Sequence, residues 1–129
     1  MSTSTLFIGG SWTAASDGGT RDIHCPADGK LVGSVAEATA ADAERAVAAA
    51  RAAFDRGEWA GKSALERGSF LLQVANRLRG RKDDFARAET LDTGKRLVES
   101  EIDMDDIANC FEYFGKLAGQ YSGRVVDAG

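Results

Sequence analysis

The chain has 129 residues, of which 16 are Lys or Arg and 20 are Asp or Glu, so its formal net charge is -4. This length allows one domain, and the acidic balance argues against binding to nucleic acid or an anionic membrane, since both need a basic face. Hydrophobic residues make up 43% of the chain, which excludes a disordered protein, and no apolar run reaches the roughly 20 residues of a membrane span.

The N-terminal residues and the two cysteines indicate that the protein is located in the cytoplasm. Met1 to Thr5 lack the basic start and the apolar stretch of a signal peptide. Cys25 and Cys110 are isolated from each other and form no disulfide framework. We therefore expect a cytoplasmic protein with reduced thiols.

Short strands are predicted over the first third of the chain. Gly9-Gly10 lies between β-favouring residues at 6–8 and 11–13, which predicts a hairpin with a two-residue turn. The turn Pro26-Ala27-Asp28-Gly29 separates a strand at 20–25 from another at 30–35, which predicts a second hairpin. The hairpins are thus expected at about 5–35.

Helices are predicted from about residue 40 to about residue 122. Thr39 and Asp42 suit the start of the first helix, and Gly57 suits its end. Ser63 and Glu66 form a capping box for the second helix, which we expect to break at Gly80. A third helix is predicted over 83–92, with a stop at Gly94.

The last predicted helix is the most amphipathic. Its acids, Asp103 and Asp106 among them, are expected in its first turn, where free amides favour them. An apolar stripe follows at helical spacing: Ile107, Cys110, Phe111, Phe114, Leu117 and Tyr121. Residues 124–127 then have the pattern of a beginning strand.

The residues alone supply no complete active site. The stretch 57–63 has three residues between its glycines instead of the four of a phosphate loop, and 101–112 lacks the glycine of a calcium loop. His24 is the only histidine, and strand alternation points it away from Cys25. Cys110 lies on the apolar stripe, so we predict a core role for it. One histidine and two distant cysteines lack metal-ligand spacing.

Five motifs in order resemble the N-terminal quarter of the NAD(P)-dependent aldehyde dehydrogenase family. They are Leu6-Phe7-Ile8-Gly9-Gly10-Ser11-Trp12, Cys25-Pro26-Ala27-Asp28-Gly29-Lys30, the alanine-rich run 42–54, Glu89-Thr90-Leu91-Asp92-Thr93-Gly94-Lys95, and Glu112-Tyr113-Phe114-Gly115. The resemblance covers nearly the whole chain. Cys25 stands where the family commonly has asparagine, and Arg96 where it commonly has proline.

The resemblance implies a fold of the α/β, aldehyde dehydrogenase-like class. Residues 1–129 would form the N-terminal part of such a protein, an incomplete cofactor-domain scaffold of β-hairpins followed by about four amphipathic helices. The implied reaction oxidises an aldehyde to a carboxylic acid with NAD(P)+ through a cysteine thiohemiacetal. In the family the nucleophile, the general base and the dinucleotide site all lie beyond this segment. No catalytic or cofactor-binding residue is therefore carried over, and NAD or NADP is expected to bind only the longer protein.

The resemblance carries over two weaker sets of site residues. Some members hold a structural monovalent cation, K+ or Na+, with a carboxylate corresponding to Asp92 and backbone carbonyls near Ile23 and His24. The alternative is that Asp92 accepts backbone hydrogen bonds in the turn before Gly94. The start of the last helix lines the family's substrate entrance. The corresponding residues here are Asp103, Asp106 and Cys110, where acids would suit a cationic aldehyde, although solvated first-turn acids need no such role.

Two hypotheses about function remain open at this stage. In the first, the chain is the N-terminal segment of an aldehyde dehydrogenase and is inactive alone, because its helices lean on a Rossmann-type sheet that it lacks. Its partners would be the remainder of such a chain or a second copy of itself. In the second, it is a stand-alone helical protein-interaction module whose apolar faces close on one another.

Overall fold

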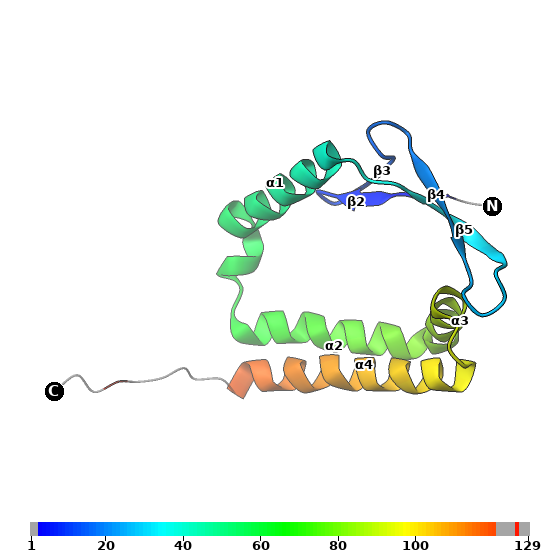
Figure 1. Ribbon diagram of the computed structural model, residues 1–129. Helices are drawn as coiled ribbons and strands as arrows, with labels where there is room; N and C mark the ends of the chain where they lie inside the picture. The colour runs from blue at the N-terminus through cyan, green and yellow to red at the C-terminus, as the bar shows by residue number, and fades with distance from the viewer. Residues whose placement is uncertain (1–2, 121–125, 127–129) are drawn as a thin grey trace.

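The computed structural model describes residues 3–120 and 126 and shows hairpins followed by helices (Figure 1). The strands are β1 (Thr3–Ser4), β2 (Leu6–Ile8), β3 (Ser11–Thr13), β4 (Thr20–His24) and β5 (Leu31–Ala36). The helices are α1 (Ala40–Arg56), α2 (Ala64–Gly80), α3 (Lys82–Thr93) and α4 (Leu97–Leu117), with short 3-10 turns η1 (Glu58–Gly61) and η2 (Ala118–Gln120). The predicted order of hairpins and four helices is confirmed.

The first hairpin forms as its glycine pair predicts. Gly9 and Gly10 have φ values of 60° and 84°, which L-residues with side chains rarely adopt, so the chain reverses in two residues. β2 and β3 pair antiparallel, and the rings of Phe7 and Trp12 lie 4.9 Å apart across the pair. Both rings remain largely exposed.

The second hairpin belongs to a three-stranded sheet of order β1-β5-β4. β4 and β5 pair antiparallel, and the turn between them is closed by the Gly29 amide, which donates to the Cys25 carbonyl at 2.8 Å. β1 adds to the other edge of β5 in parallel. The sequence analysis missed β1, because a two-residue strand has no periodicity and exists only through its partner.

Local signals set the limits of the helices. α1 starts after the predicted N-cap Thr39 and α2 after the predicted capping box of Ser63. At α1 the structure adds the reciprocal bond from Asp42, so its N-cap is a capping box as well. α2 ends at Gly80, and α3 ends where Gly94 takes a left-handed φ of 75° and donates its amide to the Thr90 carbonyl. Each of these ends was predicted, because caps and glycines act over a few residues only.

α4 starts earlier than predicted. Its first residue is Leu97, so Asp103 and Asp106 lie in its second and third turns and not in its first. The explanation of these acids as first-turn residues attracted by free amides is therefore wrong. The sequence misled because α4 begins at Arg96 without a side-chain cap, whereas the acids downstream mimic a helix start.

α2 and α4 lie antiparallel, side by side, and make the most extensive contact between any two elements (Figure 1). Their contact, called the seam below, brings Gly68 of α2 against Gly115 of α4. The buried residues of the two helices are Gly68, Ala75, Ser100, Met104, Ala108 and Gly115. Of these, Ser100 bonds to Thr90 of α3 at 2.9 Å. Of the predicted apolar stripe, Ile107 and Phe114 are 39% and 52% exposed, and Tyr121 lies outside the described residues. Apart from Met104, the buried positions of the two helices thus carry small side chains, which allow the helices to approach closely.

Much of the apolar surface of the helices is uncovered within this chain. On α1, Val47 and Phe54 of the predicted stripe are 69% and 72% exposed. Cys110 is exposed as well, so the predicted core role of this cysteine is wrong for the chain as it stands. These faces are exposed to solvent because no described element packs over them.

Two further observations complete the fold. The strand predicted at 124–127 lies outside the described residues, apart from Val126. Among the helices of the described part of the chain, none has the length and apolarity that crossing a membrane requires.

Candidate functional site

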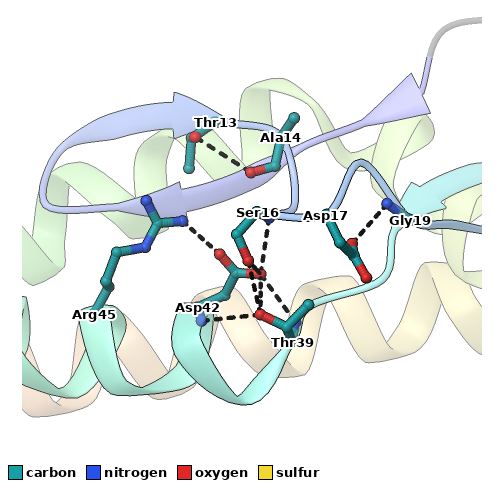
Figure 2. A network of polar contacts seen from close by, with 8 residues as sticks. All are labelled: Thr13, Ala14, Ser16, Asp17, Gly19, Thr39, Asp42 and Arg45. Carbon is teal, nitrogen blue, oxygen red and sulfur yellow. Dashed lines mark hydrogen bonds and ion pairs between the residues drawn. The ribbon is translucent and has the colours of Figure 1, made fainter.

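The most tightly bonded polar group of the described residues is the Asp42 carboxylate in the first turn of α1 (Figure 2). Its Oδ2 accepts from the backbone amides of Thr39 at 2.9 Å and Ser16 at 3.1 Å, and from both of their hydroxyls. Its Oδ1 accepts from Arg45. These bonds, the Thr39 amide foremost, hold the pKa of Asp42 well below its usual range.

This network is structural and not catalytic. Asp42 is only 1% exposed, and both of its oxygens are already engaged, so it has no free lone pair facing a ligand. Its function is to tie the start of α1 to the loop at Ser16, 26 residues earlier in the chain. The capping pair Thr39 and Asp42 was predicted, but the bond to Ser16 was missed because no local pattern announces it.

The residues predicted to hold a monovalent cation lie around the second hairpin and the end of α3. Ile23 and His24 end β4, and Asp92 lies exposed in the last turn of α3. The two regions adjoin, since a Cβ built on Gly94 would lie 3.0 Å from the Ala27 backbone nitrogen. Figure 1 shows α3 beside the β4–β5 hairpin.

The alternative role for Asp92 is not formed. Among residues 3–120 and 126, no backbone amide donates to its carboxylate, and the turn is closed by Gly94 and Thr90 instead. A carboxylate oxygen and free helix-end carbonyls are the hard donors that K+ and Na+ accept. In the part of the chain that the structure describes, no three His, Cys, Asp or Glu side chains gather as a metal cluster.

The three residues predicted at the substrate entrance share one row of α4 but have different surroundings. Asp103 forms an ion pair with Lys95 from the α3–α4 turn. Asp106, one turn further, is exposed. Cys110 lines an apolar recess of about 240 Å³ with Leu71 and Phe114 between α2 and α4. The family resemblance named these three positions, and their spacing of three and four residues places them on one face of α4. No local pattern indicated the contact of Asp103 with Lys95.

Neither cysteine has the surroundings of a nucleophile. Cys25 is buried directly after β4, whereas its neighbour His24 is exposed. Cys110 has apolar neighbours, and no cationic group lies on its recess. Among the described residues, neither thiol is thus placed as a reacting group.

Comparison with known proteins gives one consistent family. The model of the aldehyde dehydrogenase family matches residues 12–129. Betaine aldehyde dehydrogenase of Bacillus subtilis (strain 168) is 44% identical over 124 residues, which are 96% of this chain and 25% of that protein. Aminoaldehyde dehydrogenase 2 of Zea mays is 42% identical over 122 residues, 92% of this chain and 24% of that protein.

A solved structure agrees in fold. Betaine aldehyde dehydrogenase from Staphylococcus aureus, in complex with NAD+, superposes with a TM-score of 0.93 at 42% identity, over 97% of this chain and 25% of that one. The chain therefore spans about a quarter of the length of the relatives it matches. The small hairpins and four helices are those of the N-terminal part of that fold, and the chain belongs to the aldehyde dehydrogenase family as a segment of its N-terminal part.

Proposed function

We propose that this chain is the N-terminal scaffold of an enzyme that oxidises an aldehyde to a carboxylic acid with NAD+ or NADP+. The observation that carries the proposal is the match over 97% of the chain to one quarter of an NAD+-bound aldehyde dehydrogenase. The nicotinamide would accept the hydride in the longer protein. The chain's own part is to build one side of the incomplete cofactor domain, so that alone it binds no cofactor and turns over no aldehyde.

A cationic aldehyde is the proposed substrate class. The relatives are named for betaine aldehyde and for aminoaldehydes, which carry a positive charge at neutral pH. Asp103 and Asp106 lie on one row of α4, at the positions that the resemblance places at the entrance. Carboxylates at an entrance raise the local concentration of cations.

We also propose a structural monovalent cation at the end of α3, held by Asp92 and by backbone carbonyls near Ile23 and His24. The support is the exposed, unbonded carboxylate beside the β4–β5 hairpin. A cation there would offset the repulsion between the carboxylate and the free carbonyls of the helix end. Its role would be to fix α3 against the hairpin.

The proposed partner is the rest of an aldehyde dehydrogenase chain, or else a second copy of this one. Exposed apolar side chains on α1 and α4 support it, Phe54 at 72% and Phe114 at 52% among them. For the compartment we propose the cytoplasm, because both cysteines are free thiols. Relatives from Atriplex hortensis and Beta vulgaris are named chloroplastic.

Complementation tests this proposal. The purified 129-residue protein, given betaine aldehyde and NAD+, should produce no NADH. Adding the remaining three quarters of the Bacillus subtilis relative, expressed separately, should restore NADH production. The control is that remainder alone, which should be inactive because the segment that covers its cofactor domain is missing.

Two outcomes would contradict the proposal. Aldehyde-dependent NADH from the 129-residue protein alone would show that it carries a reacting group of its own. A monomer that unfolds cooperatively, binds no dye for apolar surface and fails to complement would favour the interaction module instead.

A further inference from the structure

Three charged side chains meet where α3 turns into α4. The ammonium group of Lys95 lies 3.1 Å from Glu89 Oε1, and it also forms an ion pair with Asp103 of α4. All three side chains are partly covered, with 30% of Lys95, 25% of Glu89 and 39% of Asp103 exposed. One ammonium is thus shared by two carboxylates from different helices.

Lys95 bonds to only one of the two oxygens of Glu89 and also to Asp103. The second oxygen of Glu89, Oε2, is buried and has no hydrogen-bond partner among the described residues. Hydrogen bonds to Asp103 and then Glu89 raise the pKa of Lys95, and the bond from Lys95 lowers the pKa of Asp103. Lys95 therefore stays charged at neutral pH, and Asp103 is ionised but paired.

Asp106 differs from Asp103 although both lie on one row of α4. It is exposed, and within residues 3–120 and 126 it has no ion-pair partner. A paired carboxylate attracts a further cation weakly, because the neighbouring ammonium cancels most of its field. The two acids are therefore unequal as binding groups.

We propose that Lys95 is a positioning residue that pairs with Asp103 and so keeps this carboxylate from binding the substrate. Of the two acids on this face of α4, Asp106 alone then remains open to a cationic aldehyde. The proposal rests on the proposed function for the substrate and on the ion-pair geometry for the role of Lys95. It predicts that the lysine in the α3–α4 turn tunes selectivity for cationic over neutral aldehydes without touching the substrate.

The first test measures Asp103 directly in a chimera of the Bacillus subtilis relative in which this chain replaces the matching quarter. NMR titration of its carboxyl carbon should give a pKa below the ordinary 3.8 in the wild type, and Lys95→Met should raise it, since the partner cation is lost while Glu89 remains close. Lys82→Met is the matched control. It removes the same charge from Asp105, 2.6 Å away and two residues along α4, and should leave Asp103 unchanged.

The second test measures selectivity in the same chimera. Lys95→Met should lower the KM for betaine aldehyde roughly fivefold, with kcat unchanged. The KM for its neutral carbon isostere, tert-butylacetaldehyde, should not move. Lys95→Arg should keep the wild-type values, and adding Asp103→Asn to Lys95→Met should reverse the gain.

The outcomes separate this proposal from the proposed function. An Asp103 pKa that is the same in wild type and Lys95→Met would overturn the role of Lys95, whatever the kinetic constants are. A shifted pKa with equal effects on both aldehydes would overturn the link to selectivity. An inactive chimera would count against the proposed function, and the titration would still decide whether Lys95 pairs with Asp103.

Discussion

At the scale of single residues, Asp42 shows how a buried carboxylate organises the fold. A buried charge is costly unless each of its oxygens is bonded, and Asp42 meets this condition with donors from the loop at Ser16, from Thr39 and from Arg45 (Figure 2). Its bonds join segments that are far apart in sequence. We therefore expect the orientation of α1 against the hairpins to depend on this one side chain.

The contribution of the Asp42 carboxylate to stability can be tested with Asp42→Asn at different pH values. The folded state lowers the pKa of Asp42 below its ordinary 3.8, so the carboxylate stabilises the fold above about pH 4 and this contribution is lost as the pH falls further. The variant should have a lower urea midpoint than the wild type at neutral pH, and the difference should narrow in acid. Asp55→Asn, which removes an exposed carboxylate from the same helix, is the control. A difference independent of pH would refute this account.

At the scale of elements, the contact between α2 and α4 depends on the absence of side chains. A Cβ on Gly68 would lie 2.5 Å from the Gly115 carbonyl oxygen and 3.1 Å from the Ala118 Cβ. Backbone cannot yield as a flexible side chain can, so any larger residue must push the helices apart. The seam is therefore set by steric limits more than by buried apolar area.

Gly68→Ala should destabilise the protein although alanine favours helices. The gain in helix propensity is at most about 1 kcal/mol, whereas overpacking a closed contact costs about 1–3 kcal/mol. Gly80→Ala in the same helix is the matched control, since its Cβ would meet nothing within 4 Å. Chemical denaturation of both variants measures the difference, and equal unfolding midpoints would disprove the steric argument.

At the scale of the whole molecule, the arrangement leaves apolar faces without partners. The hairpins, α1, the α2–α4 pair and α3 follow one another around a ring in Figure 1, which closes where α3 lies beside the β4–β5 hairpin. Large apolar side chains on several of these elements remain exposed. A compact monomer of this size buries such groups. The exposed faces agree with a chain that spans about a quarter of its relatives.

Phe114→Glu tests whether these faces cause self-association. The side chain is 52% exposed, so the substitution should reduce the sedimenting mass and change the unfolding midpoint little. Met104→Glu, in the same helix but with Met104 only 8% exposed, should instead abolish folding, because it buries an unpaired charge. If Phe114→Glu sediments like the wild type, another surface drives the association.

Local sequence signals were sufficient to predict most helices and hairpins of this protein. The N-cap at Thr39, the capping box at Ser63, the turn at Gly9-Gly10 and the stop at Gly94 were predicted because each acts through bonds within a few residues. The family was predicted from the sequence as well, because five motifs in the right order indicate it although none of them contains a catalytic residue.

The folded arrangement was needed to show which face of α4 is buried, where β1 pairs, and which residues bond to Asp42 and Asp103. An apolar stripe indicates that a helix face is to be buried, but it does not identify the element that packs on that face. The close approach of α2 buries small residues of α4, whereas larger residues of the stripe, Phe114 among them, stay exposed among the described residues. Contacts between distant segments leave no local pattern, because the geometry that creates them exists only after the chain has folded.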